Sequence, residues 1–65
     1  MGRISAFEWR VLRDLSLDGR VERGAATNQA LETLRSWGYI IPLENGTHGV
    51  TADGQAEILK GEPNA

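Results

Sequence analysis

The sequence predicts a small α+β domain with the order helix, loop, helix, two-stranded hairpin, helix. Three observations predict this order: apolar stretches with helical spacing, an Asn-Gly pair between two short apolar runs, and a Thr-x-x-Gly segment before the last apolar stretch. With 65 residues, we expect one domain over 1–65, structured over 4–60, with a tail over 61–65. A chain of this size buries only about 60% of its unfolded surface, so its core is small.

The composition excludes several classes of function. The chain has no cysteine and one histidine, which rules out disulfides, thiol catalysis and a zinc site built on cysteines or several histidines. No nucleophile accompanied by a base, no paired carboxylates in a catalytic context and no glycine-rich phosphate loop are found, so we expect neither enzyme activity nor a metal or cofactor. No apolar run approaches the roughly 20 residues that span a bilayer, and the N-terminus lacks the apolar stretch of a signal peptide. These features predict a cytoplasmic protein that does not enter a membrane.

The formal net charge is −2, and it is unevenly distributed. Residues 1–35 hold six arginines against five carboxylates, whereas residues 36–65 hold one lysine against four carboxylates. A basic face is therefore expected only in the N-terminal half. All cations there are arginines, which suit bidentate contact with phosphate, guanine or carboxylate.

The first helix is predicted over about 6–17. Ser5 and Glu8 have the spacing of a capping box, in which each side chain binds the backbone N–H of the other residue. Gly19 follows as a left-handed stop. The expected apolar stripe consists of Phe7, Val11, Leu12 and Leu15, and Ile4 and Trp9 are placed for a hydrophobic staple.

A second helix is predicted over 28–37, after a loop over 19–26 that shows no helical period. Thr27 is expected to cap this helix at its start and Gly38 to end it. Its predicted buried stripe consists of Ala30, Leu31, Leu34 and Trp37.

The remaining chain predicts a hairpin and a closing helix. A strand is expected over 39–41, where Pro42 limits it to an edge, and Asn45-Gly46 favours a tight turn into a return strand over 48–50. Thr51 would then cap a helix over about 52–60. The apolar positions of that helix are Ala56, Ile58 and Leu59, and the expected core joins Leu34, Trp37, Ile40, Val50 and Ile58 to the first stripe.

These motifs together resemble the bacterial winged helix-turn-helix domain. The pattern L-x-x-L-x-x-x-G-Y-I over 31–40, followed by V-T-x-x-G-x-x-x-I-L over 50–59, is similar to the back half of that family, and F-x-x-x-V-L-x-x-L over 7–15 is similar to its first helix. The resemblance covers about 4–60. It implies a winged-helix-like fold in which the second predicted helix is the recognition helix and 39–50 is the wing. One departure is clear: the family's usual second helix is shortened or missing.

The resemblance implies a set of DNA-binding residues. Arg20 and Arg23 would clamp phosphates, and the wing would contribute contacts to phosphates or a minor groove. The alternative interpretations are a surface charge cluster with Asp18 and Glu22 for the loop and a plain turn for the wing. The major-groove residues would be Thr27, Asn28, Gln29 and Arg35, with Glu32 and Ser36 beside them, and the wing residues Asn45, Thr47 and His48.

Two functions remain open at this point. The first is a small DNA-binding transcriptional regulator, expected to act on double-stranded DNA as a homodimer because one short domain rarely buries enough surface for specific affinity. The second is a winged-helix protein-interaction module, such as a phage-type modulator of a host protein, that does not bind DNA. DNA binding requires arginines to converge on one face, whereas the alternative predicts that they scatter or pair internally. The arginines in question are Arg10, Arg13, Arg20, Arg23 and Arg35.

Overall fold

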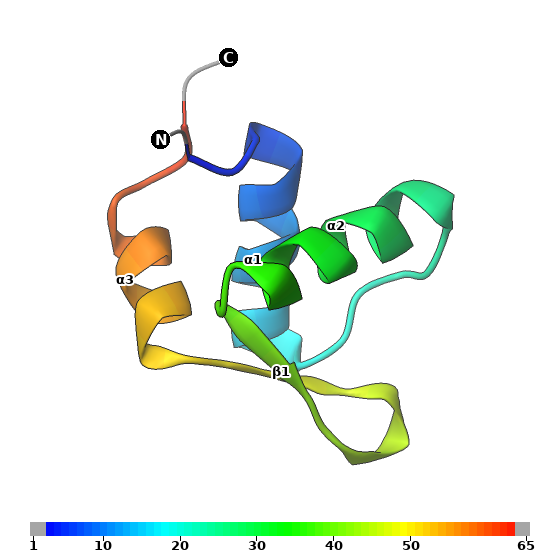
Figure 1. Ribbon diagram of the computed structural model, residues 1–65. Coiled ribbons are helices and arrows are strands. Elements are labelled where there is room, and N and C mark those ends of the chain that lie inside the picture. The colour runs from blue at the N-terminus through cyan, green and yellow to red at the C-terminus, as the bar shows by residue number, and fades with distance from the viewer. Residues whose placement is uncertain (1–2, 64–65) are drawn as a thin grey trace.

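The computed structural model describes residues 3–63 and contains three helices and one two-stranded antiparallel hairpin (Figure 1). This confirms the predicted α+β class and the predicted order of elements. Residues 20–23, between the first two helices, form no helix, so the usual second helix of a winged helix-turn-helix is absent. The elements are α1 (Ala6–Asp18), α2 (Ala25–Ser36), β1 (Ile40–Pro42), the 3-10 turn η1 (Glu44–Gly46), β2 (His48–Val50) and α3 (Ala52–Leu59).

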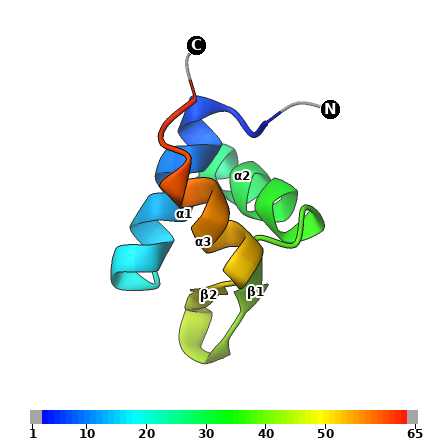
Figure 2. The same cartoon turned by 90° about the vertical axis from the view of Figure 1, so that its left-hand side faces the viewer.

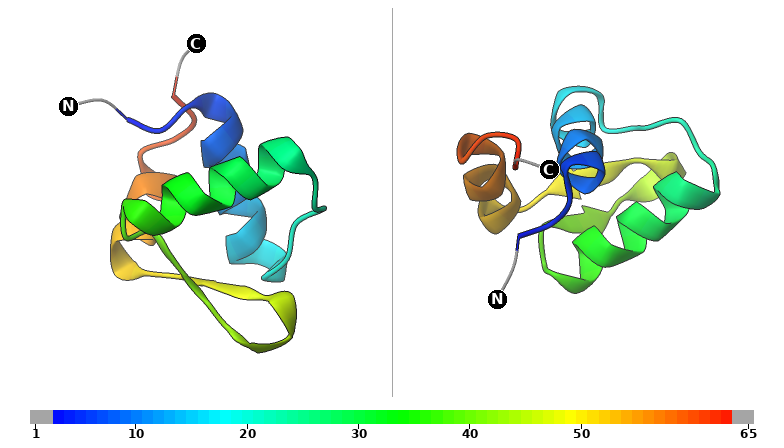
Figure 3. Two further views of the ribbon diagram at one scale, coloured as in Figure 1. Left: turned by 45° about the vertical axis from the view of Figure 1, so that its right-hand side comes forward. Right: turned by 90° about the horizontal axis from the view of Figure 1, so that it is seen from above.

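α1 is the central helix, in contact with α2, α3 and β2 (Figure 3). The predicted capping box is present: the Ser5 Oγ accepts from the Glu8 N–H at 3.2 Å, and Glu8 Oε1 accepts from the Ser5 N–H at 2.9 Å. Gly19 ends the helix with a φ of 75°, and its N–H donates to the Leu15 carbonyl at 2.7 Å. The local signals therefore define both ends of α1.

α2 begins earlier than predicted. It starts at Ala25, and Gly24 occupies the cap position in an extended conformation without a side-chain hydrogen bond. The prediction that Thr27 caps the helix was wrong, because Ala25 and Ala26 have high helix propensity and extend the helix toward its N-terminus. Thr27 instead lies in the first turn, half-buried.

α2 ends at a left-handed glycine, as predicted. Gly38 has a φ of 81°, its N–H donates to the Arg35 carbonyl, and the Tyr39 N–H donates to the Leu34 carbonyl, each at 3.0 Å. This pair of bonds is a Schellman motif. Trp37 is the C-cap rather than part of the buried stripe, and it is 40% exposed, with its ring 5.7 Å from that of Tyr39. The prediction of Trp37 as a core residue was wrong because the chain leaves the helix there.

The hairpin pairs Ile40 with Val50 and Pro42 with His48 (Figure 2). Its turn is the predicted Asn-Gly pair: Asn45 and Gly46 both have positive φ, at 62° and 74°, which this turn type requires. The hairpin is also attached to the end of α1, since the His48 N–H donates to the Gly19 carbonyl at 2.9 Å.

α3 packs against β2 and the residues just before β1 through the Thr-x-x-Gly segment. The Thr51 Oγ1 accepts from the Gly54 N–H at 3.1 Å, which confirms the predicted cap, and donates to the Gly38 carbonyl at 2.6 Å. Gly54 is buried, and a Cβ at this position would collide with the Tyr39 carbonyl oxygen and with the Val50 side chain. The segment therefore combines a helix cap with a contact that only glycine allows.

The core lies where α1 meets α2, α3 and the hairpin. Trp9 is buried, and its indole N–H donates to the Glu57 carbonyl of α3 at 3.3 Å. Phe7 was predicted to be a core position, but it is 46% exposed, because the buried face of α1 centres on other residues. Leu59, an apolar position of the last predicted helix, is 86% exposed. The buried apolar residues are Ile4, Trp9, Val11, Leu12, Leu15, Ala30, Leu31, Leu34 and Ile40, with Val21, Tyr39, Val50 and Ile58 partly buried around them.

A buried carboxylate occupies the inner face of α3. Glu57 is 2% exposed, and its Oε2 accepts from the Arg3 Nε at 2.7 Å. Its Oε1 lies 3.3 Å from the Lys60 Nζ and accepts from the Tyr39 hydroxyl at 3.4 Å. Arg3 also donates to the Gly61 carbonyl at 2.8 Å, so the two ends of the domain are joined. Within residues 3–63, no helix has both the length and the apolar character that crossing a bilayer requires.

Candidate nucleic-acid interface

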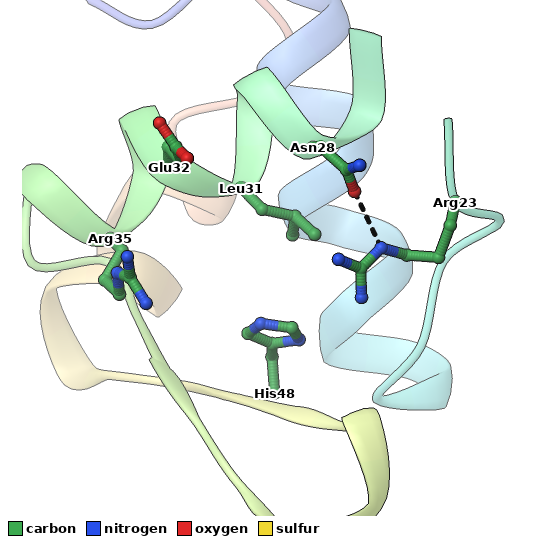
Figure 4. Close-up of a pocket in the computed structure, with 6 residues that line it drawn as sticks. All are labelled: Arg23, Asn28, Leu31, Glu32, Arg35 and His48. Carbon is green, nitrogen blue, oxygen red and sulfur yellow. Dashed lines mark hydrogen bonds between the residues drawn. The ribbon is translucent and has the colours of Figure 1, made fainter. Parts of the chain in front are cut away.

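A hollow of about 280 Å³ opens between α2 and the hairpin, beside the loop that connects α1 to α2 (Figure 4). It brings together side chains from the loop, from α2 and from β2, the last of which is distant in the sequence from the other two. Its lining consists of Arg23, Asn28, Leu31, Glu32, Arg35 and His48.

Helix geometry and strand pairing place these side chains. Asn28, Glu32 and Arg35 are spaced four and three residues apart, so they share one face of α2. His48 projects toward that face from β2, and in Figure 4 it lies between Arg23 on one side and Arg35 on the other. The bond from the His48 N–H to the Gly19 carbonyl, at 2.9 Å, holds the start of the loop against β2.

Arg23 is held by a side chain of α2. Its Nε donates to the Asn28 Oδ1 at 2.7 Å, a short bond for a charged donor. The rest of the guanidinium group lies between Asn28 and His48 (Figure 4). The Arg23 fork therefore retains free N–H groups on the side of the hollow.

The hollow is electropositive. Within the described residues, neither Arg23 nor Arg35 forms an ion pair. Burial lowers the pKa of His48 below its ordinary 6.5, and the charges of Arg23 and Arg35 lower it further. The imidazole is thus neutral at pH 7. Glu32 is the one carboxylate in the lining.

This arrangement suits an anion with several oxygen atoms. Two guanidinium groups offer paired N–H donors, which match the oxygens of a phosphate or carboxylate. In the part of the chain that the structure describes, no three His, Cys, Asp or Glu side chains gather as a metal site would require.

The other arginines behave differently. Arg10 forms an ion pair with Glu62 at 2.7 Å, and Arg13 lies 3.6 Å from Asp14 and 5.4 Å from the centre of the Trp9 ring. Arg20 is exposed and does not line the hollow. The five arginines considered from the sequence therefore divide into three groups: two meet at the hollow, two contact other side chains, and Arg20 is exposed outside the hollow.

The remaining predicted site residues lie outside the hollow. Thr27 precedes the buried Ala30 and Leu34 by three and seven residues, so it faces the core side of α2. Gln29 is exposed on the helix face beside Asn28. At the tip of the hairpin, Asn45 adopts a left-handed conformation and the Thr47 hydroxyl donates to the Glu44 carbonyl at 2.8 Å.

Sequence reasoning named each charged or polar member of the hollow but not their association. It assigned Arg23 to phosphates, with a charge cluster involving Asp18 and Glu22 as the alternative, whereas in the structure Arg23 binds Asn28. It also assigned His48 to a separate wing contact. The spacing of five residues between Arg23 and Asn28 would have suggested the hydrogen bond between them only if the prediction had placed the start of α2 correctly.

Comparison with known proteins gives no match: no protein-family model, characterised protein or solved structure matches this chain.

Proposed function

We propose that the protein is a small DNA-binding regulator that contacts double-stranded DNA with α2, the preceding loop and the hairpin. The observation that carries this proposal is the convergence of Arg23 and Arg35, both without an ion-pair partner among the described residues, at the junction of α2 and β2. Arginine contacts to phosphates supply most of the sequence-independent affinity for DNA. The helix, hairpin, helix order and the resemblance to winged helix-turn-helix domains support the same arrangement.

In this mechanism α2 approaches the major groove and the hairpin lies along the neighbouring backbone. Arg23 and Arg35 contact phosphates, and the exposed Arg20 adds a further charge in the same loop. Gln29, which is exposed and does not line the hollow, is available to a base edge. Two copies on one site would supply the surface that a single short domain lacks.

The test is the binding of a fluorescent random-sequence duplex at about 20 mM salt, where phosphate contacts are strongest, repeated as the salt is raised. We expect the double variant Arg23→Ala/Arg35→Ala to bind more weakly and to reduce the slope of log affinity against log salt by about 1 for each phosphate that the two side chains contact. The matched control is Arg10→Ala/Arg13→Ala, which removes the same charge from α1. Absence of wild-type binding at low salt, or equal losses in both double variants, would contradict the proposal.

One observation favours a second candidate, a protein-interaction module. Ile41 and Leu43 are both about half exposed on the outer face of the hairpin, and both lie over Gly49, within 3.5 Å of where its Cβ would stand. An exposed apolar pair of this kind suits a protein partner. This candidate predicts that the wild type does not bind DNA but captures a protein partner. The variant Ile41→Ser/Leu43→Ser should lose that partner, and the variant Arg23→Ala/Arg35→Ala should retain it.

A further inference from the structure

Asn28 sits where a recognition helix would read bases, but its acceptor oxygen already binds Arg23. An asparagine that reads adenine accepts from the base N6 with its Oδ1 and donates to N7 with its amide nitrogen. In this structure Oδ1 accepts from the Arg23 Nε at 2.7 Å. Oδ1 retains a second lone pair, but the Arg23 bond fixes the direction of the amide group, so Asn28 is held toward Arg23.

The same bond fixes the direction of the Arg23 fork. An arginine side chain in a loop has several rotatable bonds, and ordering it costs conformational entropy. The bond to Asn28 anchors Nε to α2, which leaves the two terminal nitrogens beside the hollow and His48 (Figure 4). Arg35 approaches the hollow from seven residues further along the same helix, so both guanidinium groups are held relative to one element.

We propose that Asn28 is a positioning residue: it orients Arg23 so that Arg23 and Arg35 together grip a single backbone phosphate of DNA between α2 and the hairpin. This inference rests on the proposed function and specifies what the hollow receives. A phosphate diester presents two non-bridging oxygens, one for each guanidinium group. Binding of DNA at this site then depends on the phosphate backbone of the DNA and not on its base sequence.

The charge balance of the site agrees with this ligand. The lining contains two arginines, a neutral imidazole and one carboxylate, that of Glu32. A monoanionic diester neutralises the excess positive charge without requiring any lining residue to change its partner. Asn28 keeps its bond to Arg23 in the complex.

The experiment compares two duplexes of equal length at one salt concentration: one of mixed sequence, and one built only of G·C pairs, which contains no adenine. The proteins are the wild type, Arg23→Ala, Asn28→Ala, the double variant Arg23→Ala/Asn28→Ala and the control Arg10→Ala. We expect Asn28→Ala to weaken binding about threefold to tenfold, and by the same factor on both duplexes. Since Asn28 acts through Arg23, the double variant should bind no more weakly than Arg23→Ala alone.

The outcomes separate this inference from the proposed function. The positioning role would be overturned if Asn28→Ala lost affinity only for the adenine-containing duplex. It would also be overturned if the affinity losses of Asn28→Ala and Arg23→Ala multiplied in the double variant. Unchanged binding in Asn28→Ala would overturn it as well. If the wild type binds neither duplex, the proposed function fails, and titration with inorganic phosphate decides about the hollow itself. The phosphate site would be supported if phosphate shifted the NMR signals of the Arg23 and Arg35 Nε–H groups and if Asn28→Ala made these shifts smaller. The absence of shifts would reject the site.

Discussion

Arg3 and Glu57 lie 54 positions apart in the sequence, yet their side chains form a 2.7 Å ion pair in which the carboxylate is almost fully buried. A buried carboxylate is stable only when charged and hydrogen-bonded partners replace its lost water. Arg3 therefore fastens the segment before α1 to α3. Trp9, whose indole N–H donates to the Glu57 carbonyl, binds the same turn of α3 from the core.

We expect Arg3→Ala to lower the free energy of unfolding by about 1 to 3 kcal/mol, because it leaves Glu57 buried with fewer partners. Lys60 and Tyr39 remain and limit the loss. Urea unfolding measures the effect. Arg10→Ala is the control, since its partner Glu62 is exposed and such pairs contribute less than about 1 kcal/mol. Equal effects of the two substitutions would show that the buried pair is not a distinct source of stability.

Gly54→Ala should be the more damaging substitution. Its Cβ would collide with the Tyr39 carbonyl oxygen and the Val50 side chain, so α3 must move away from the hairpin. We expect a loss of about 3 kcal/mol or more. Gly24→Ala provides the matched control, because its φ of −179° is open to any residue and nothing lies within 4 Å of the added methyl group. A Gly54→Ala melting temperature close to that of the control would contradict the packing described here.

The stability of the fold should fall in two steps as the pH is lowered. A group whose pKa is lower in the folded state stabilises the fold above its unfolded pKa and loses that contribution as the pH falls. The pKa of His48 is lowered from 6.5 by burial and by two arginines, which places the first step below pH 6.5. Burial raises the pKa of Glu57, but Arg3 and Lys60 lower it by more, to below its ordinary 4.5, which places the second step below pH 4.5.

Thermal melts between pH 8 and pH 3 test both steps. His48→Gln should remove the first step and leave the second, while Glu57→Gln should flatten the second. A melting temperature of the wild type that rises between pH 7 and pH 5.5 would contradict the assignment to His48.

DNA affinity should respond to pH in the opposite direction from stability. Without a ligand, Arg23 and Arg35 disfavour the protonated form of His48. A phosphate between them would favour that form, so binding takes up a proton and strengthens as the pH falls from about 7 toward 5.5. Fluorescence anisotropy at constant ionic strength measures this trend. His48→Gln should bind with little dependence on pH, and an unchanged trend in that variant would place the titrating group elsewhere.

Local signals account for most of what could be predicted about the fold. The ends of α1, the Asn45-Gly46 turn and the cap at Thr51 depend on neighbours within a few residues, and each was predicted correctly. The errors in α2 were local as well: Ala25 and Ala26 extend the helix beyond the predicted cap at Thr27, and Trp37 falls where the chain leaves the helix. The burial of Glu57 depends instead on a distant residue, Arg3, which no periodicity connects to it.

In the candidate site, too, the residues could be predicted but their arrangement could not. Arg23, Asn28, Arg35 and His48 were all proposed from the sequence as DNA contacts, on residue type and on resemblance. Their meeting in one hollow depends on the register of the hairpin and on the bond from His48 to Gly19, neither of which a single sequence specifies. The Arg23 to Asn28 bond changes the role expected of Asn28 from reading bases to orienting a cation.

The bond from Arg3 to the Gly61 carbonyl also bears on protein engineering. It places residues 3 and 61 side by side at the end of the molecule away from the hairpin (Figure 1). A short peptide could therefore join the two ends, and the chain could be reopened within the exposed turn at Asn45-Gly46. Such a circular permutant would retain every helix and the lining of the hollow while severing the hairpin at its tip. Two copies linked end to end would likewise keep both hollows uncovered.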